Sequence, residues 1–564
     1  HMLPRNKTSV LLLGALVAVL ALTIYFPLGT MLYESLWVNG RFSFAHFVRF
    51  FDVNQPANLQ ALWGSVKISV LSVLFSAFVG VPLAVLFTRF EFPGRKLFGL
   101  FVTLPMLLPP LVGVIAFYFL MGETGIVPRL LQKFLDLSTP PLVMRGVPAI
   151  LLIHTYSFYV FFYLLARNAL ANADRSLEEA AYGLGARRGR VWRQVILPQL
   201  RPALLGAAML VFMNAMASFT APYLFGGDWR FLSLEIYNAK LNGDFPLALT
   251  QSVILASIST AFVFLLRWYG NRYELGRGSK GVLAPPHLVT ATWQKVILAC
   301  VGFVIILVLI LPQLTLLLMA FVKNGTWTYQ ILPDTFTFEN FLDLFRNPKA
   351  AEPWLNSLWM SAIATVFGTV VALLAAYFAG RKQRISGASG LVEMSVMLPW
   401  AVPGTVIAMA LIVAFDRPHW FTAGTILIGT SAMLPLAYFI RHLPVQFRAT
   451  VAAFAQLDPA LEEAAQNLGA RWWLRFRAVT LPLILPGLAT GAMAAFVIAL
   501  GEFVSSILLY TYSNRPISVA IFSELRLFNL GSAAAYAILL TVLIGSVMAL
   551  AQKFQGARTP DMTT

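Results

Sequence analysis

Two matching polar segments carry the most distinctive residue spacing of this chain. The first contains Leu-Glu-Glu-Ala-Ala at 177–181, then Gly185, then Leu-Pro at 197–198; the second repeats these residues 284 positions later. The repeated copy lies at 461–465, with Gly469 and Leu-Pro at 481–482. Neither segment offers a nucleophile beside a base. Glutamates and small alanines at this spacing instead suit a helix surface that a partner protein approaches closely.

Each polar segment also carries signals for a helix start and a helix end. Asp458 followed by Pro459 is typical of an N-cap with proline in the first turn, and Asp174 occupies the matching place. Ser176 with Glu179 three residues later is an alternative capping box in the first copy. A glycine follows each apolar face, where helices end in a left-handed residue. We therefore predict surface helices at about 174–190 and 458–474. Their shared apolar faces are expected to hold Leu177, Ala180, Ala181 and Leu184, and Leu461, Ala464, Ala465 and Leu468.

The composition predicts an all-α membrane protein. Of the 564 residues, 59% are hydrophobic and only 12% are charged, which excludes an ordinary soluble globular chain. Apolar runs long enough to cross a bilayer as helices recur along the whole chain, and the alternating pattern of a β-barrel is absent. We expect about twelve transmembrane helices, near 10–36, 64–88, 98–121, 147–166, 202–225, 247–268, 293–322, 356–380, 388–415, 421–440, 484–511 and 533–552.

The repeat extends beyond the polar segments and divides the chain into two halves. Leu104, Pro105 and Pro109 in the third predicted helix match Leu398, Pro399 and Pro403 in the ninth, and these prolines are expected to kink their helices. We predict a first half at 1–270, a polar linker at 271–291 and a second half at 292–564. Six helices per half keep both halves in the same orientation, as a parallel repeat.

The distribution of charge predicts the orientation in the membrane. The chain carries a net charge of +17, and alternating assignment of the polar segments places this excess on the side that bears the two repeated segments. That side, with both termini, is therefore expected to be cytoplasmic. Nucleic-acid binding is a poor interpretation, because the charges lie between membrane spans rather than along one face of a soluble domain.

The repeated segments resemble the EAA loops of permease subunits in binding-protein-dependent ABC importers of the type I fold. The duplication within one chain is similar to the fused permeases, most of all those of ferric-iron uptake. The resemblance implies a permease of a bacterial inner (plasma) membrane that works by alternating access. It also implies that each EAA loop docks a helix into an ATPase subunit. The implied contact residues are Glu179, Ala180, Ala181 and Gly185, and Glu463, Ala464, Ala465 and Gly469; Arg187 and Arg471 either assist them or simply set topology.

The same resemblance implies partners that supply what the chain lacks. No phosphate-binding Gly-x-x-x-x-Gly-Lys-Ser/Thr loop, catalytic constellation or metal-ligand cluster is found in the sequence, so we expect no catalytic residue, no resident metal and no cofactor. Two ABC ATPase subunits on the cytoplasmic face would bind ATP and Mg²⁺, and a solute-binding protein would dock on the outer face. The sequence leaves open whether the two ATPases are identical.

The transported substrate is less well specified. Glu502 lies in an apolar run beside Ser505 and Ser506, and its first-half counterpart is Ser218. An acid inside a membrane segment suggests a functional role, so we predict that these four residues line the pathway. One carboxylate favours a cationic or hard-metal substrate; a helix–helix hydrogen bond is the alternative role. Ferric iron is the first prediction, with thiamine, polyamine and 2-aminoethylphosphonate as alternatives. An ion-coupled secondary transporter and a membrane scaffold are alternatives from other classes.

Overall fold

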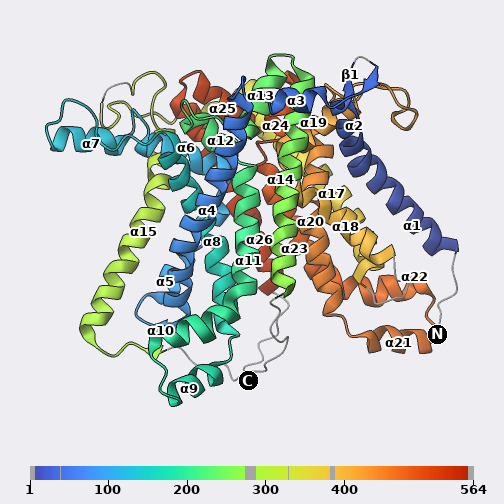
Figure 1. The fold of residues 1–564 in the computed structure, drawn as a ribbon, viewed down its shortest axis with the longest axis horizontal. Helices are drawn as coiled ribbons and strands as arrows, with labels where there is room; N and C mark the ends of the chain where they lie inside the picture. The colour runs from blue at the N-terminus through green and yellow to red at the C-terminus, as the bar shows by residue number, and fades with distance from the viewer. Residues whose placement is uncertain (1–6, 39, 273–286, 328–329, 381–387, 557–564) are drawn as a thin grey trace. The chain divides into compact units, whose positions relative to one another are not determined.

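Long helices dominate the architecture (Figure 1). The structure is a computed structural model that describes residues 7–38, 40–272, 287–327, 330–380 and 388–556. The strands in these residues are two-residue pieces. β1 (Trp37–Val38) pairs antiparallel with β2 (Arg41–Phe42), and β3 (Phe90–Glu91) pairs parallel with β4 (His287–Leu288). Most of the linker predicted at 271–291 lies outside the described residues.

The helices form two compact units, and neither unit is one continuous half of the sequence. One unit contains residues 1–48, 243–253 and 337–564, and the other contains 49–242 and 254–336. The helices of the first unit are α1 (Lys7–Leu20), η1 (Ala21–Tyr25), α2 (Phe26–Ser35), α16 (Glu339–Arg346), α17 (Pro348–Gly380), α18 (Ala388–Ala401), α19 (Gly404–Ala414), η4 (Trp420–Thr422), α20 (Met433–Ala455), α21 (Pro459–Asn467), α22 (Trp472–Arg475), η5 (Phe476–Thr480), α23 (Leu481–Leu500), α24 (Ser506–Leu509), η6 (Tyr512–Asn514), α25 (Ile517–Arg526) and α26 (Leu530–Gly556).

The second unit holds most helices of the first sequence half together with α15 of the second half. They are α4 (Ala57–Arg89), α5 (Arg95–Val102), η2 (Leu104–Leu107), α6 (Pro110–Met121), α7 (Ile126–Phe134), α8 (Gly146–Ala171), α9 (Arg175–Gly183), α10 (Arg188–Val191), η3 (Trp192–Ile196), α11 (Leu197–Met216), α12 (Thr220–Phe225), α13 (Leu232–Leu241) and α15 (Thr292–Ala320). Two helices, α3 (Ala45–Phe50) and α14 (Phe245–Arg272), contribute residues to both units.

The first membrane helix of each sequence half packs against the core of the other half. α2 packs on α19, and α15 packs on α5 and α6. Within the second unit, the Tyr156 hydroxyl on α8 donates to the Leu309 carbonyl of α15 at 2.9 Å. The repeat boundary near 271–291 therefore divides the sequence but not the packing. The first membrane helix of each sequence half packs with helices of the other half.

Ten described helical segments are long and apolar enough to cross a membrane. They lie at 10–35, 57–89, 110–134, 146–171, 188–216, 245–266, 292–320, 348–379, 472–500 and 530–551. An eleventh candidate is the bent pair at 389–401 and 404–414. The fold is thereby all-α, with the membrane-spanning candidates distributed over two sequence repeats.

The span predicted at 421–440 is wrong in its placement. The helix of this region is α20, which begins at Met433 and ends at Ala455. It carries Arg441 and Arg448, so it falls outside the ten apolar segments. The apolar residues at 421–432 belong instead to η4 and a turn in which Ala423, Gly424 and Gly429 have positive φ.

Pro109 and Pro403 interrupt helices as predicted, whereas Pro399 lies inside α18. Pro403 has extended geometry (φ −57°, ψ 148°) and caps α19, and the axes of α18 and α19 differ by 107°. Pro109 caps α6 in the same way, with φ −55° and ψ 136°. Proline lacks the N–H that would continue the ladder, so the break falls at this residue in both halves. α19 is buried on almost all sides after the break.

Small residues let α20 and α23 approach closely. A Cβ placed on Gly487 would lie 2.5 Å from the Ala453 Cβ, and one on Gly491 would lie 2.7 Å from the Ala449 Cβ. The four-residue spacing of the two glycines is the usual device for close helix contact in membranes.

We predict that Gly491→Ala destabilises the protein by about 1–3 kcal/mol, because its methyl group would enter an occupied space. Thermal unfolding of the purified protein in detergent should show a lower midpoint. Gly545→Ala is the matched control, because open space surrounds Gly545 in α26. Equal midpoints for the two variants would contradict the packing argument.

Candidate functional site

The first repeated segment folds as the short helix α9, whose two ends are capped locally. The Asp174 carboxylate accepts from the Ser176 N–H at 3.0 Å, so Asp174 is the N-cap and the alternative Ser176 capping box does not form. At the other end Gly185 has φ +79°, and the Ala186 N–H donates to the Ala181 carbonyl at 3.0 Å. A left-handed glycine with this bond is a Schellman ending.

The second segment, α21, has the same design. The Asp458 carboxylate accepts from the Ala460 N–H at 2.9 Å, and Pro459 occupies the first turn. Gly469 has φ +82°, and the Ala470 N–H donates to the Ala465 carbonyl at 3.1 Å. The aspartate and glycine caps lie where the sequence placed them, but the helices are shorter than the predicted 174–190 and 458–474. α9 ends at Gly183 and α21 at Asn467, and the separate helices α10 and α22 follow.

The first glutamate of each Glu-Glu pair attaches its surface helix to the rest of the unit. Glu178 is buried and forms a two-pronged ion pair with Arg89 at the end of α4, with Arg89 Nη1 to Glu178 Oε2 at 2.8 Å. In α21, Glu462 accepts from the Thr480 hydroxyl at 2.5 Å. Sequence reasoning missed both contacts. The available signal was the doubled glutamate: adjacent residues of a helix point about 100° apart, so one of the pair can face the protein while the other faces solvent.

The outward faces of α9 and α21 are apolar and exposed. Leu177 and Leu184 are 50% and 90% exposed as whole residues, and Leu461 and Leu468 are 47% and 89% exposed. The residues that the sequence assigned to a partner contact are mostly on this outer surface: Glu179, Ala180, Gly185, Glu463, Ala464 and Gly469 are exposed, whereas Ala181 and Ala465 are half-buried. Ala181 packs against the core of its unit, so it does not share the fully outward face.

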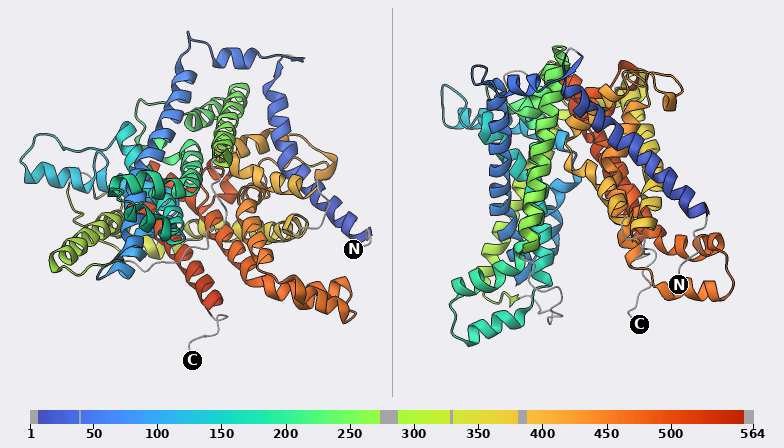
Figure 2. Two further views of the ribbon diagram at one scale, coloured as in Figure 1. Left: turned by 60° about the horizontal axis from the view of Figure 1, so that its bottom comes forward. Right: turned by 45° about the vertical axis from the view of Figure 1, so that its right-hand side comes forward.

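A short helix, α10 or α22, and then a π-helical turn lead from each surface helix to the next membrane helix. These turns are η3 and η5, and each runs directly into the Leu-Pro pair that begins α11 or α23. Within its own unit, α9 lies at the end opposite α7 and α13; within the other unit, α21 lies at the end opposite α25 (Figure 1, Figure 2).

The two copies differ immediately after the glycine. Arg188, Gly189 and Arg190 are exposed in the first copy. The second copy has Trp472, Trp473 and Leu474 at these positions; the Trp472 ring N–H donates to the Tyr377 hydroxyl at 2.9 Å, while Trp473 is 60% exposed. One surface helix is thus flanked by charge and the other by aromatic rings.

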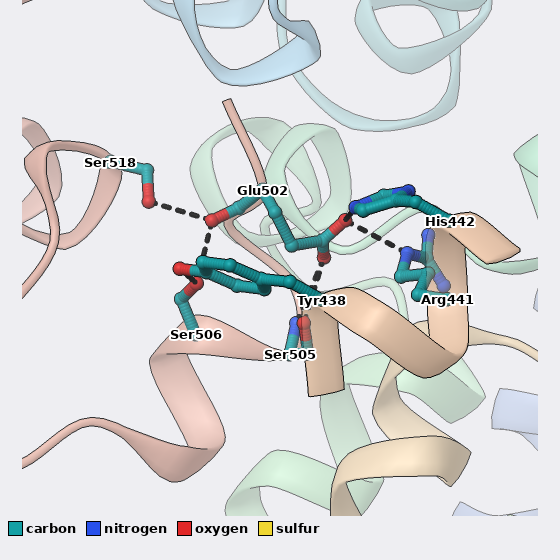
Figure 3. Close-up of polar contacts among 7 residues, drawn as sticks. All are labelled: Tyr438, Arg441, His442, Glu502, Ser505, Ser506 and Ser518. Carbon is teal, nitrogen blue, oxygen red and sulfur yellow. Dashed lines mark hydrogen bonds and ion pairs between the residues drawn. The ribbon is translucent and has the colours of Figure 1, made fainter. Parts of the chain in front are cut away.

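A second candidate site surrounds Glu502, which follows the end of α23 (Figure 3). Its carboxylate accepts from Arg441 Nε at 2.8 Å and from the N–H and hydroxyl of Ser505, both at 3.1 Å. Its backbone carbonyl accepts from the hydroxyls of Ser506 and Ser518 at 2.6 and 2.8 Å. Glu502 thus forms the interhelical hydrogen bonds that the sequence offered as the alternative role. Its part in the pathway stays a prediction.

The equivalent place in the first half is polar but carries no charge pair. The His154 Nε2 atom lies 2.9 Å from the Ser218 hydroxyl, and His154 Nδ1 lies 2.8 Å from the Ser72 hydroxyl. The Ser218 carbonyl accepts from the Ser233 hydroxyl at 2.6 Å, as the Glu502 carbonyl accepts from Ser518. Both halves therefore keep a serine that donates to the backbone carbonyl at this position, but the residue itself is serine in the first half and glutamate in the second.

Neither site has the composition of a metal centre. Over the described ranges, no three His, Cys, Asp or Glu side chains are grouped as ligands of one ion. Glu502 and His442 are neighbours, with 3.7 Å between His442 Nε2 and Glu502 Oε2, but the third charged group there is an arginine.

Comparison with known proteins assigns the repeat to a family. The family described as binding-protein-dependent transport system inner membrane component matches residues 76–274 and again 368–559. A probable ABC transporter permease protein, y4fN of Sinorhizobium fredii, is 27% identical over 89% of this chain and 88% of its own length. The ferric transport system permease protein FbpB of Actinobacillus pleuropneumoniae is 26% identical over 95% of this chain and 77% of its own. The thiamine transport system permease protein ThiP of Escherichia coli is 25% identical over 88% and 89%.

We predict that Arg89→Gln loosens α9, because it leaves the buried Glu178 carboxylate without its counter-charge. Amide hydrogen exchange in 175–183 should accelerate by roughly tenfold or more, or about 1.4 kcal/mol. Arg193→Gln, at an exposed arginine just after α10, should leave this exchange unchanged. The double change Arg89→Gln with Glu178→Gln should recover part of the protection. Unchanged exchange in Arg89→Gln would show that the ion pair does not hold α9.

Proposed function

The chain belongs to the family of binding-protein-dependent transport system inner membrane components, and from this membership we propose that it is the fused translocation subunit of an ATP-driven importer. It would accept a solute from an external binding protein and pass it to the cytoplasm. The observation that carries this proposal is the pair of capped, exposed helices at matched positions in the two family repeats. An ion-coupled carrier has no need for two such helices.

The outer faces of α9 and α21 are the docking surfaces for two ATPase subunits. Their exposed leucines and alanines would fill an apolar groove, and Glu179, Gly185, Glu463 and Gly469 would lie at its edges. ATP and Mg²⁺ would be bound by the ATPases, and the chain would hold no cofactor of its own. Two surfaces flanked by different residues also leave room for two non-identical ATPases.

The anchoring of α9 and α21 suggests how ATPase movement reaches the membrane. Glu178 ties α9 to the end of α4 through Arg89, and Glu462 ties α21 to η5 through Thr480. A displacement of either surface helix would therefore be transmitted to long membrane helices instead of being absorbed by a loop. Alternating access would follow if ATP and its products favour different arrangements of these helices.

The orientation follows from the same docking. If α9 and α21 meet soluble ATPases, their ends of the two units face the cytoplasm. The excess of positive residues that flanks the repeated segments supports this orientation. A bacterial inner membrane, with both termini cytoplasmic, is the corresponding location.

Ferric iron is the substrate we propose first. The named ferric permease matches along 95% of this chain, although the thiamine permease matches nearly as widely, so thiamine remains a second candidate. Polyamine and 2-aminoethylphosphonate are further candidates from the sequence resemblance. Glu502, Ser505, Ser506 and Ser218 would border the pathway at the ends of α11 and α23.

We predict that Leu184→Ala and Leu468→Ala each weaken ATPase association, and that the double variant weakens it further. Loss of a well-buried interface leucine costs about 1–2 kcal/mol, or roughly 5–30-fold in affinity. Co-purification and titration of the ATPase against the permease in nanodiscs would measure this. Leu527→Ala is the matched control, since Leu527 is also an exposed C-cap leucine (67%) but belongs to α25. Full ATPase binding by the double variant would refute the docking surfaces.

We predict that the reconstituted permease–ATPase complex hydrolyses ATP faster with an iron-loaded binding protein than with the same protein unloaded. Thiamine, polyamine and 2-aminoethylphosphonate binding proteins with their ligands should be compared in parallel. Stimulation by one of these binding proteins instead would support the importer function but replace iron as the proposed substrate. Failure to assemble with any ATPase would favour a secondary transporter.

A further inference from the structure

Arg441 lies in the middle of α20, and only one of its guanidinium nitrogens, Nε, donates a hydrogen bond to another described residue. Its Nε donates to Glu502, and its side chain remains 22% exposed. In the described part of the chain its Nη atoms have no further hydrogen bond. The guanidinium lies against Gly404, the first residue of α19: a Cβ there would be 2.6 Å from Nη1 and 2.9 Å from Cζ.

Two residues next in sequence to Arg441 and Gly404 also have buried polar atoms without partners. The Nε2 atom of His442 and the hydroxyl of Thr405 are buried without a hydrogen bond among the described residues. Figure 3 shows the His442 ring and the Arg441 guanidinium both directed toward Glu502. Thr405 is the second residue of α19, whose N-terminal end carries partial positive charge. The Thr405 hydroxyl can donate a hydrogen bond, and so can His442 Nε2 in the tautomer that carries its proton there.

The carboxylate, by contrast, is almost saturated. Glu502 accepts three hydrogen bonds, one of them from the arginine, and it is only 6% exposed. A cation entering here would have to displace Arg441 and would then meet it as a like charge. The sequence suggested a cation ligand from the carboxylate alone; with Arg441 beside it, the local preference turns toward an anion.

The first half of the chain is an internal control for what the fold requires. Aligned on the repeated motifs, Ser157 stands for Arg441, Ser218 for Glu502, Pro110 for Gly404 and Leu111 for Thr405. The first half builds its break, α6 and α11 without a charge pair and without the donors of Gly404 and Thr405. Charges inside a membrane protein are costly, so a pair that the fold does not need suggests a ligand.

We propose that the break between α18 and α19 carries a recognition site for an oxyanion, with Arg441 as its charged donor and Thr405 and His442 as supporting groups. Glu502 holds the arginine in place. The ligand would be a phosphate or carboxylate group, either free or attached to the transported solute. This deepens the proposed import function, because it assigns to the substrate, or to an anion that accompanies it, a negatively charged group.

Titration of the purified chain in nanodiscs with inorganic phosphate and, separately, with citrate tests the proposal by calorimetry. Wild type should bind at least one of the two anions, and Arg441→Gln should weaken that binding at least tenfold. Thr405→Val keeps the shape and removes only the hydroxyl, so a smaller loss of about threefold is expected. Arg448→Gln, at an exposed arginine of the same helix, should bind as wild type does.

Glu502→Gln distinguishes the two signs of ligand. An oxyanion site should retain or tighten its affinity, because Arg441 loses its counter-charge; a cation site should lose binding. If Arg441→Gln misfolds, Thr405→Val and Glu502→Gln still decide. No binding of either anion by wild type, or equal binding by wild type and Arg441→Gln, would overturn the proposal.

Separate controls identify the source of the anion and the state of the complex. Binding of free phosphate or citrate that leaves transport unchanged would indicate a resident anion, whereas competition with the solute delivered by the binding protein would indicate a group on the cargo. ATPase association of the same preparations reports on the proposed importer independently, so its loss would not be confused with loss of the anion site.

Discussion

The need to satisfy backbone groups wherever a helix breaks inside the apolar region governs this structure. Hydrocarbon offers no hydrogen bonds, so each interrupted helix must find partners within the protein. At the ends of α11 and α23, a serine from the following segment donates to a carbonyl that the helix break leaves without a helical partner: Ser233 to Ser218 and Ser518 to Glu502. Once these carbonyls are satisfied, the chain can turn and place short helices between the long ones.

The two halves differ in their side chains at these same helix breaks. A neutral His154–Ser218 contact serves in one half and an Arg441–Glu502 ion pair in the other, on equivalent helices. Because both arrangements support the same turn, the side chains are free to differ in function. A duplicated permease can thereby keep one scaffold and give its halves different polar character.

In the surface helices α9 and α21, different residues cap the helix, anchor it and face outward. Their caps and glycines are local features, and their first glutamates are used for anchoring, which leaves leucine and alanine outward. A helix of nine residues has little stability of its own in water, so it depends on these contacts. Its rigidity is what would allow a partner's movement to reach α4, α11 and α23.

The sequence by itself determined the membrane class, the repeat, most spans, the proline breaks and both capped helices, because hydropathy, proline and capping act over a few residues. Only the tertiary structure decided that Glu178 faces inward to Arg89, that Glu502 is paired with Arg441 and that α15 packs with α5 and α6. The misplaced span at 421–440 has the same origin: apolar residues there fill a turn, and the charge of Arg441 in the following helix is paired with Glu502. Such choices depend on partners distant in sequence, which spacing alone cannot specify.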